Sequence, residues 1–238
     1  AMNLLLFSDA DRRTGDRIEV SGRRLQHLRD VIRAQPGDSL RVGEIEGLMG
    51  LGRIIELGND SATLQVVLTE PPPAKLPITV VVALPRPKML RRLLRTIAEA
   101  GVRDLHLVTS YRVETSYWQS PALEPDTLRD YLLQGLEQAR DTQLPQVTLH
   151  RRFKPFVEDD FPGLIANRRA LLAQPGEYPL APADSGIDSV LVIGPEGGFI
   201  PYEVEKLMTA GCTAVSLGSR ILRVETAVNT MLGRLLRP

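Results

Sequence analysis

The spacing of hydrophobic residues changes along the chain and predicts two parts of different architecture. Up to about residue 70, short apolar stretches alternate with turn-forming residues, which is typical of a small β-barrel or sandwich. The expected strands are residues 4–7, 39–42, 52–57 and 62–68, and one amphipathic helix is expected at about residues 23–33. The glycine-rich residues 47–52 lead into a strand pattern, which favours a β-hairpin over a phosphate-binding loop.

Beyond residue 77 the apolar residues predict alternating strands and helices. A buried strand at residues 78–84 is followed by a helix at about residues 87–100 with apolar residues at helical spacing. The later strands are expected at residues 105–109, 147–150, 170–173, 190–193 and 214–217. The later helices are expected near residues 125–140, 156–167, 201–210 and 225–236. This alternation predicts an α/β domain with a mostly parallel sheet and ligands at the carboxyl ends of its strands.

A proline-rich segment at residues 71–77 separates the two patterns. Consecutive prolines fix the backbone angle φ and remove amide donors, so they favour a stiff, extended linker. We therefore expect two domains, at residues 1–72 and 73–238.

The composition excludes several classes of protein. With 43% hydrophobic and 24% charged residues, the chain of 238 residues is expected to fold into a globular protein. Its longest apolar run, residues 80–84, is far shorter than the roughly 20 residues that cross a bilayer, and no signal-peptide pattern precedes it. A single cysteine and three scattered histidines indicate neither a disulfide framework nor a metal site. We expect a soluble, cytoplasmic protein without a metal or a membrane partner.

The charges balance in total but cluster locally. Lys plus Arg and Asp plus Glu both number 29, so no net charge attracts a polyanion from a distance. Two basic stretches, residues 12–33 and residues 86–95, could bind nucleic acid, and the second contains no acidic residue. Solvated helix faces are the alternative explanation for both.

Two loops that follow predicted strands have an unusual composition. Residues 194–199, Gly-Pro-Glu-Gly-Gly-Phe, could let the backbone approach a ligand closely, or could form a plain strand-to-helix turn. In the second loop, Arg220 and Arg223 bracket Ile221 and Leu222, which could cover a flat apolar ligand or plug the core. Neither loop has the G-x-G-x-x-G spacing of a dinucleotide site, and no G-x-S-x-G motif is present. Cys212 is expected to be a buried thiol.

Together these loops resemble the paired signature of the RsmE family, SPOUT-type methyltransferases that methylate N3 of a uridine in 16S ribosomal RNA. Residues 27–33 with the following Pro-Gly-Asp resemble the family's N-terminal PUA-like barrel. Glu137 and Gln138 with Arg140 resemble its E-Q-x-x-R element, with one residue instead of two before the arginine. The chain departs from the family at Ala100, where leucine is usual, and at residues 111–114, where a Glu-Arg-Ser pattern is usual.

The resemblance implies a fold, a cofactor and partners. The implied fold is a SPOUT-type, trefoil-knotted, mostly parallel sheet with helices on both faces, preceded by a small RNA-binding PUA-like β-barrel. S-adenosylmethionine is the implied methyl donor, and the implied partners are 16S rRNA in the assembled small subunit and a second copy of the chain, as a homodimer. The apolar stripe of the last helix, from Val224 to Leu235, could pack on that partner or on its own sheet.

The resemblance also implies site residues. The residues expected to bind the cofactor are Leu172, Ala173, Ile193, Gly194, Pro195, Gly197, Gly198, Leu217, Gly218, Ser219, Ile221, Leu222, Thr226 and Ala227. Those expected to contact RNA are Arg12, Arg13, Arg23, Arg24, Arg33, Arg86, Lys88, Arg91 and Arg220.

The residues expected to be catalytic are Arg223 and Glu225. Arg223 would orient the uracil or stabilise its anion, and Glu225 would hold Arg223 or accept the proton. Glu225 could instead be a first-turn carboxylate that favours the helix dipole. Two other functions stay open: a knotted methyltransferase acting on tRNA or another rRNA site, and a non-catalytic RNA-binding factor for ribosome assembly.

Overall fold

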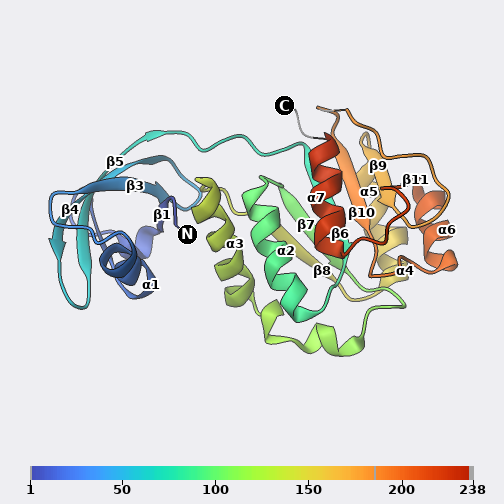
Figure 1. Cartoon of the computed structure of the whole chain (residues 1–238), viewed down its shortest axis with the longest axis horizontal. Coiled ribbons are helices and arrows are strands. Elements are labelled where there is room, and N and C mark those ends of the chain that lie inside the picture. The colour runs from blue at the N-terminus through green and yellow to red at the C-terminus, as the bar shows by residue number, and fades with distance from the viewer. Residues whose placement is uncertain (1, 185, 236–238) are drawn as a thin grey trace. The chain divides into compact units, whose positions relative to one another are not determined.

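A computed structural model describes residues 2–184 and 186–235 of the chain (Figure 1). Its contacts group into two compact units. The first unit comprises Ala1–Ala74 and Leu132–Leu144, and the second comprises Lys75–Tyr131 and Pro145–Pro238.

The first unit is built on a five-stranded sheet in the order β1-β3-β4-β5-β2. Its strands are β1 (Leu5–Phe7), β2 (Arg17–Val20), β3 (Ser39–Glu44), β4 (Met49–Leu57) and β5 (Ala62–Glu70). β1 pairs with β3 in parallel and the other pairs are antiparallel. The expected hairpin is formed by β3 and β4, and a Cβ at Gly50 would lie 1.8 Å from the carbonyl oxygen of Val67. Only glycine fits that position.

A helix that begins at Gly22 contributes to the core of this unit. It runs as α1 (Gly22–Gln26) and continues through a π-helical turn (His27–Val31), close to the expected residues 23–33. Leu25 and Leu28 are buried in a core with Phe7 and Ile18. Strand β2, which contributes Ile18, was missed in the sequence analysis.

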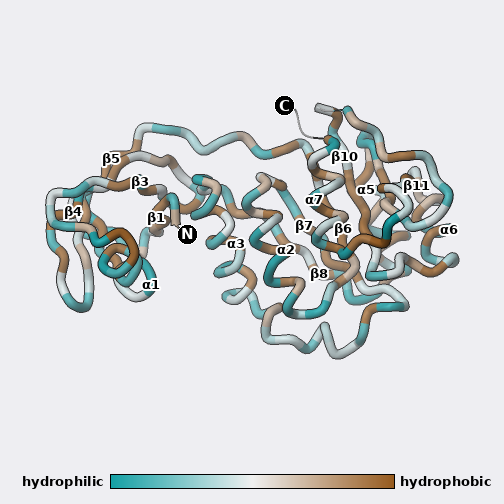
Figure 2. Tube along the Cα trace, in the orientation of Figure 1, coloured by the Kyte–Doolittle hydropathy of each residue, from teal (hydrophilic) through white to brown (hydrophobic). Residues whose placement is uncertain are grey.

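The second unit is built on a six-stranded, fully parallel sheet in the order β11-β9-β10-β6-β7-β8. Its strands are β6 (Ile78–Ala83), β7 (Asp104–Val108), β8 (Gln146–His150), β9 (Arg169–Ala173), β10 (Ser189–Ile193) and β11 (Thr213–Val215). The two central strands, β6 and β10, are buried along their whole length. Their runs of hydrophobic residues (Figure 2) are typical of a parallel sheet covered on both faces.

The helices that lie wholly in this unit are α2 (Pro87–Glu99), α4 (Phe153–Pro155), α5 (Phe161–Ile165), α6 (Pro201–Ala210) and α7 (Val224–Leu235). Helix α3 (Pro125–Ala139) begins in this unit, and its residues from Leu132 onward belong to the first unit. The helix expected near residues 156–167 is present, with an irregular turn. A π-helical turn (Phe156–Asp160) leads from α4 directly into α5, which ends at Ile165. Pro162 lacks the amide that would donate back to the preceding turn, which disfavours a regular helix there.

The apolar stripe of α7 packs inside the chain. Val228 and Met231 are fully buried, and α7 contacts α2 and β10 (Figure 1). Of the two interpretations of this stripe, packing on its own sheet is therefore the one observed. The last residue of the expected helix, residue 236, lies outside the described residues.

Candidate active site

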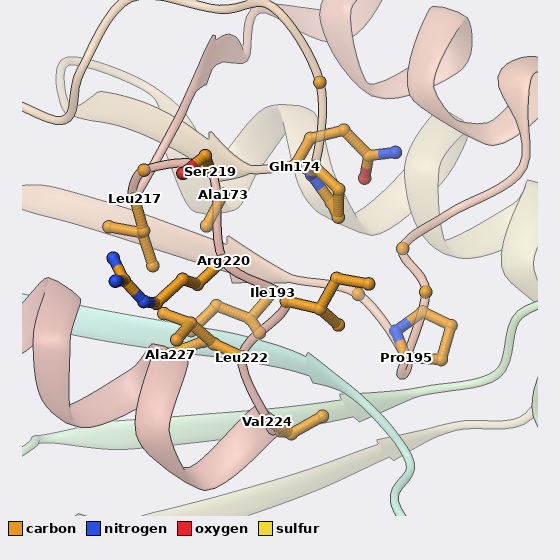
Figure 3. A pocket seen from close by; sticks show the side chains of 17 residues that line it. Ala173, Gln174, Ile193, Pro195, Leu217, Ser219, Arg220, Leu222, Val224 and Ala227 are labelled. Atoms are coloured by element: carbon orange, nitrogen blue, oxygen red, sulfur yellow. The ribbon is translucent and has the colours of Figure 1, made fainter.

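Three loops at the carboxyl edge of the parallel sheet enclose a cavity of about 260 Å³ (Figure 3). They follow β9, β10 and β11, three strands that lie at one end of the sheet. Figure 3 shows Leu217, Arg220 and Leu222 on one side of the cavity, and Gln174 and Pro195 on the other. The lining is largely apolar, with backbone polar groups supplied by glycine-rich turns.

Most residues expected to bind the cofactor line this cavity: Ala173, Ile193, Gly194, Pro195, Gly197, Gly198, Leu217, Gly218, Ser219, Ile221, Leu222 and Ala227. Leu172 and Thr226 do not. Leu172 is fully buried. It faces the side of the sheet opposite to Ala173, because neighbouring residues in a strand alternate between the two sides. Thr226 is exposed on α7. The structure adds residues that the sequence analysis did not assign to the cofactor: Gln174, Pro175, Gly176, Arg220 and Val224. A Pro-Gly pair directly after a predicted strand could have indicated the third loop.

The loop after β10 requires its glycines. Gly197 and Gly198 have φ angles of +84° and +85°, which L side chains rarely adopt. A Cβ at Gly194 would lie 2.9 Å from the ring of Phe199. The amide of Gly198 donates to the carbonyl oxygen of Pro195 at 2.8 Å, which closes a tight turn. This geometry brings the backbone itself to the cavity wall.

The loop after β11 presents apolar side chains to solvent. The side chain of Ile221 is 81% exposed and that of Leu222 is partly buried, although both line the cavity. The amide of Gly218 donates to the hydroxyl oxygen of Ser216 at 3.0 Å, which anchors the start of the loop. Ile221 therefore does not plug the core, and a ligand in the cavity would give its exposure a physical reason.

The two expected catalytic residues lie at the start of α7. Arg223 is exposed and Glu225 is partly buried, and their neighbours Val224 and Ala227 line the cavity. Among the described residues, no hydrogen bond or ion pair joins Arg223 to Glu225. The chain on its own thus offers no support for a role in which Glu225 holds Arg223.

The arginines expected to contact RNA in the first unit mostly have acidic partners. Arg23 forms two hydrogen bonds with the buried carboxylate of Glu137, at 2.6 and 2.7 Å. The remaining pairs are Arg24 with Asp11, Arg12 with Glu44, and Arg13 with Glu19. Burial raises the pKa of Asp11, but hydrogen bonds from Arg24 and from the amide of Ser8, together with the nearby arginine charges, hold the pKa below its ordinary value. Arg33 is exposed, with a left-handed φ of +50°.

In the second unit, basic side chains lie on an exposed face of α2 and just before it. Arg86, Lys88 and Arg91 are exposed. The guanidinium carbons of Arg91 and Arg95 lie 5.9 and 4.8 Å from the ring centroid of Tyr131 on α3, which orders both side chains. Arg220, which was also expected to contact RNA, lines the cavity.

Residues 2–184 and 186–235 contain no group of three His, Cys, Asp or Glu side chains arranged to hold a metal ion. His106 and His150 lie close together, with a 2.9 Å hydrogen bond between their rings. No helix in the same ranges is long and apolar enough to cross a membrane.

Similar proteins extend these observations. A family model described as "RNA methyltransferase domain" matches residues 72–236. A ribosomal RNA small subunit methyltransferase E from Treponema pallidum is 30% identical over 237 residues, covering 95% of this chain and 87% of that protein. The chain belongs to the RsmE family of small-subunit rRNA methyltransferases. A ribosomal RNA small subunit methyltransferase E from Mycobacterium tuberculosis is 28% identical over 240 residues, which cover 97% of this chain and 90% of that protein.

Solved structures share the fold of this RsmE family chain. A structure from Legionella pneumophila, in complex with the bound cofactor SAM, has a TM-score of 0.76 at 22% identity and covers 98% of this chain and 96% of that one. A ribosomal RNA small subunit methyltransferase E from Neisseria gonorrhoeae, bound to S-adenosyl methionine, has a TM-score of 0.75 at 19% identity with the same coverage. The expected SPOUT-type α/β fold is confirmed.

Proposed function

We propose that this protein transfers the methyl group of S-adenosylmethionine to N3 of a uridine in the 16S rRNA of the small ribosomal subunit, in the cytoplasm. The observation that carries the proposal is the cavity at the ends of β9, β10 and β11, in a chain of the RsmE family. The relatives from Legionella and Neisseria, which hold the same cofactor, support it.

The residues around the cavity fit this cofactor. Ile193, Leu217 and Ala227 offer apolar surfaces for an adenine ring. The turn at Gly197 and Gly198 brings the backbone to the cavity without side chains of its own. Ile221 is exposed at a position where it would cover a bound ring. We propose that these residues hold the methyl donor.

The reaction needs alignment and the loss of one proton. The cofactor supplies an electrophilic methyl group on a positively charged sulfur. A new bond joins this carbon to N3 of the uridine as the carbon–sulfur bond breaks, and the N3 proton leaves. The protein therefore has to place N3 in line with the methyl group and favour the anionic base.

We assign these tasks to the start of α7. Arg223 donates hydrogen bonds to a uracil oxygen and stabilises the negative charge that develops as the proton leaves. Glu225, one residue beyond the cavity-lining Val224, accepts the proton. If this is correct, Glu225→Gln and Arg223→Ala each lower the rate of methyl transfer, whereas near-normal rates in both variants refute the assignment.

We propose that basic residues outside the cavity bind the RNA backbone. Arg86, just before α2, and Lys88 and Arg91 on α2 are exposed and suited to phosphate contacts. The first unit acts as an RNA-binding PUA-like domain. A homodimer is part of the proposal, and its interface must use surfaces other than the buried stripe of α7.

Labelled S-adenosylmethionine tests the proposed reaction. Small ribosomal subunits that lack their native modifications are incubated with the protein, with tRNA as a parallel substrate, and the labelled nucleoside is identified. Label in 3-methyluridine of 16S rRNA supports the proposal. Label in tRNA alone refutes the proposed substrate, and no transfer together with no cofactor binding by calorimetry refutes the proposed activity.

A further inference from the structure

Arg112 reaches the cavity wall from a loop that does not line the cavity. It lies after β7, and its Nη1 atom donates to the carbonyl oxygens of Gly197 at 2.6 Å and Gly198 at 3.0 Å. These are the two consecutive glycines with positive φ angles. One charged nitrogen thus holds both carbonyls of the turn in a fixed direction, and charge-assisted hydrogen bonds are roughly twice as strong as neutral ones.

A buried carboxylate holds the segment that carries Arg112. Glu203, in the first turn of α6, is 3% exposed. Its Oε2 atom accepts from the amide of Tyr111 at 3.0 Å, and its Oε1 atom accepts from the amide of Ile200 at 3.2 Å. The two segments are therefore joined twice. Arg112 binds the glycine turn, and Glu203, which follows that turn in the chain, binds the amide of Tyr111.

A second side chain holds the loop at Phe199. Gln174 donates from Nε2 to the carbonyl oxygen of Phe199 and accepts at Oε1 from its amide, both at 3.2 Å. A Cβ at Gly198 would lie 2.9 Å from the same Nε2 atom. The backbone on both sides of the Gly198–Phe199 bond is thus held by side chains from two other loops.

We propose that Arg112 is a positioning residue that holds the methyl-donor loop in its binding-competent conformation. The inference rests on the proposed function. Two adjacent glycines have many accessible conformations, so the loop without Arg112 spends less time in the competent one. The apparent dissociation constant rises in inverse proportion to the competent fraction. Loss of Arg112 therefore weakens cofactor binding, and the rate of the chemical step is unchanged once the site is saturated.

The test compares Arg112→Ala, Arg112→Lys and a matched control, Arg129→Ala, which removes an exposed arginine on α3. Calorimetry with S-adenosylmethionine should give a dissociation constant about tenfold to a hundredfold higher for Arg112→Ala. The dissociation constant of Arg112→Lys should lie between those of Arg112→Ala and wild type. A single nitrogen of Arg112 makes both contacts, and the one nitrogen of lysine can replace it in part. The control should stay within about twofold of wild type. KM for the cofactor should rise while kcat changes little.

Hydrogen exchange in the ligand-free protein provides a readout that is independent of activity. The amides of Gly198 and Phe199 should exchange faster in Arg112→Ala than in wild type. Unchanged exchange and an unchanged dissociation constant would overturn the inference. A raised KM for RNA alone would make Arg112 a substrate contact instead. If wild type binds no S-adenosylmethionine, the proposed function fails and this inference fails with it, even where exchange shows that Arg112 holds the loop.

Discussion

Replacing Gly198 by alanine tests the structure of the cavity wall, because two separate effects oppose the new side chain. At a φ of +85°, a side chain costs about 1–2 kcal/mol. The added Cβ would also lie 2.9 Å from Gln174 Nε2 and 3.0 Å from Pro175 Cδ. Gln174 can rotate away, but it then loses both hydrogen bonds to Phe199. We expect the free energy of unfolding of the second unit to fall by about 2–3 kcal/mol.

Two other glycines separate these effects. Gly218→Ala introduces strain alone, because φ is +109° and no atom lies within 4 Å of the new Cβ, so we expect a loss of about 1–2 kcal/mol. Gly163→Ala, in α5, introduces neither effect. Because alanine favours the helix more than glycine does, this variant should raise the free energy of unfolding by up to about 1 kcal/mol.

Urea denaturation measures these differences. The chain has a single tryptophan, Trp118, and it lies in the second unit, so its fluorescence reports the unfolding of that unit alone. Calorimetry with S-adenosylmethionine should show weaker binding for Gly198→Ala than for Gly163→Ala. If these two variants unfold at the same urea concentration and bind the cofactor equally well, the reasoning from strain and close contact is refuted.

Three further predictions concern ionisable groups. Arg23→Ala should destabilise the first unit by about 1.5–3 kcal/mol, because it leaves buried Glu137 without its charged donor. Urea unfolding followed by circular dichroism measures this, and a loss of stability no larger than that of the exposed Arg13→Ala would contradict it. Burial and the charge of His106 lower the pKa of His150. Below about pH 6.5 the unfolded chain therefore takes up a proton that the native state resists, and stability falls. His150→Gln should flatten the profile of Tm against pH, and an equally steep profile would contradict the expectation. Burial raises the pKa of Cys212 to about 12, so a thiol reagent at neutral pH should label it only after denaturation, and rapid labelling of the native protein would refute this.

Two details of the structure were not apparent from the sequence pattern. The helix expected near residues 156–167 forms, but a π-helical turn precedes Pro162, whose missing amide the apolar period does not reveal. The acidic partners of the N-terminal arginines were also not apparent from the sequence. Most of these arginines pair with carboxylates such as Glu137, which is 114 residues from Arg23 in the chain. Such partners cannot be read from a local charge pattern.

The sequence by itself determined the features that depend on neighbouring residues. Apolar spacing distinguished the strand-rich first part from the alternating second part, and glycine content marked the loops after β10 and β11, because periodicity and turn chemistry act within a few residues. Only the tertiary structure decided which strands are neighbours, and hence how the loops after β9, β10 and β11, which the family resemblance had assigned to one cofactor site, enclose the cavity. It also decided that Arg112 meets Gly197, 85 residues away, and that Ile221 is exposed. Those contacts depend on the packing of the whole sheet, which no local pattern specifies.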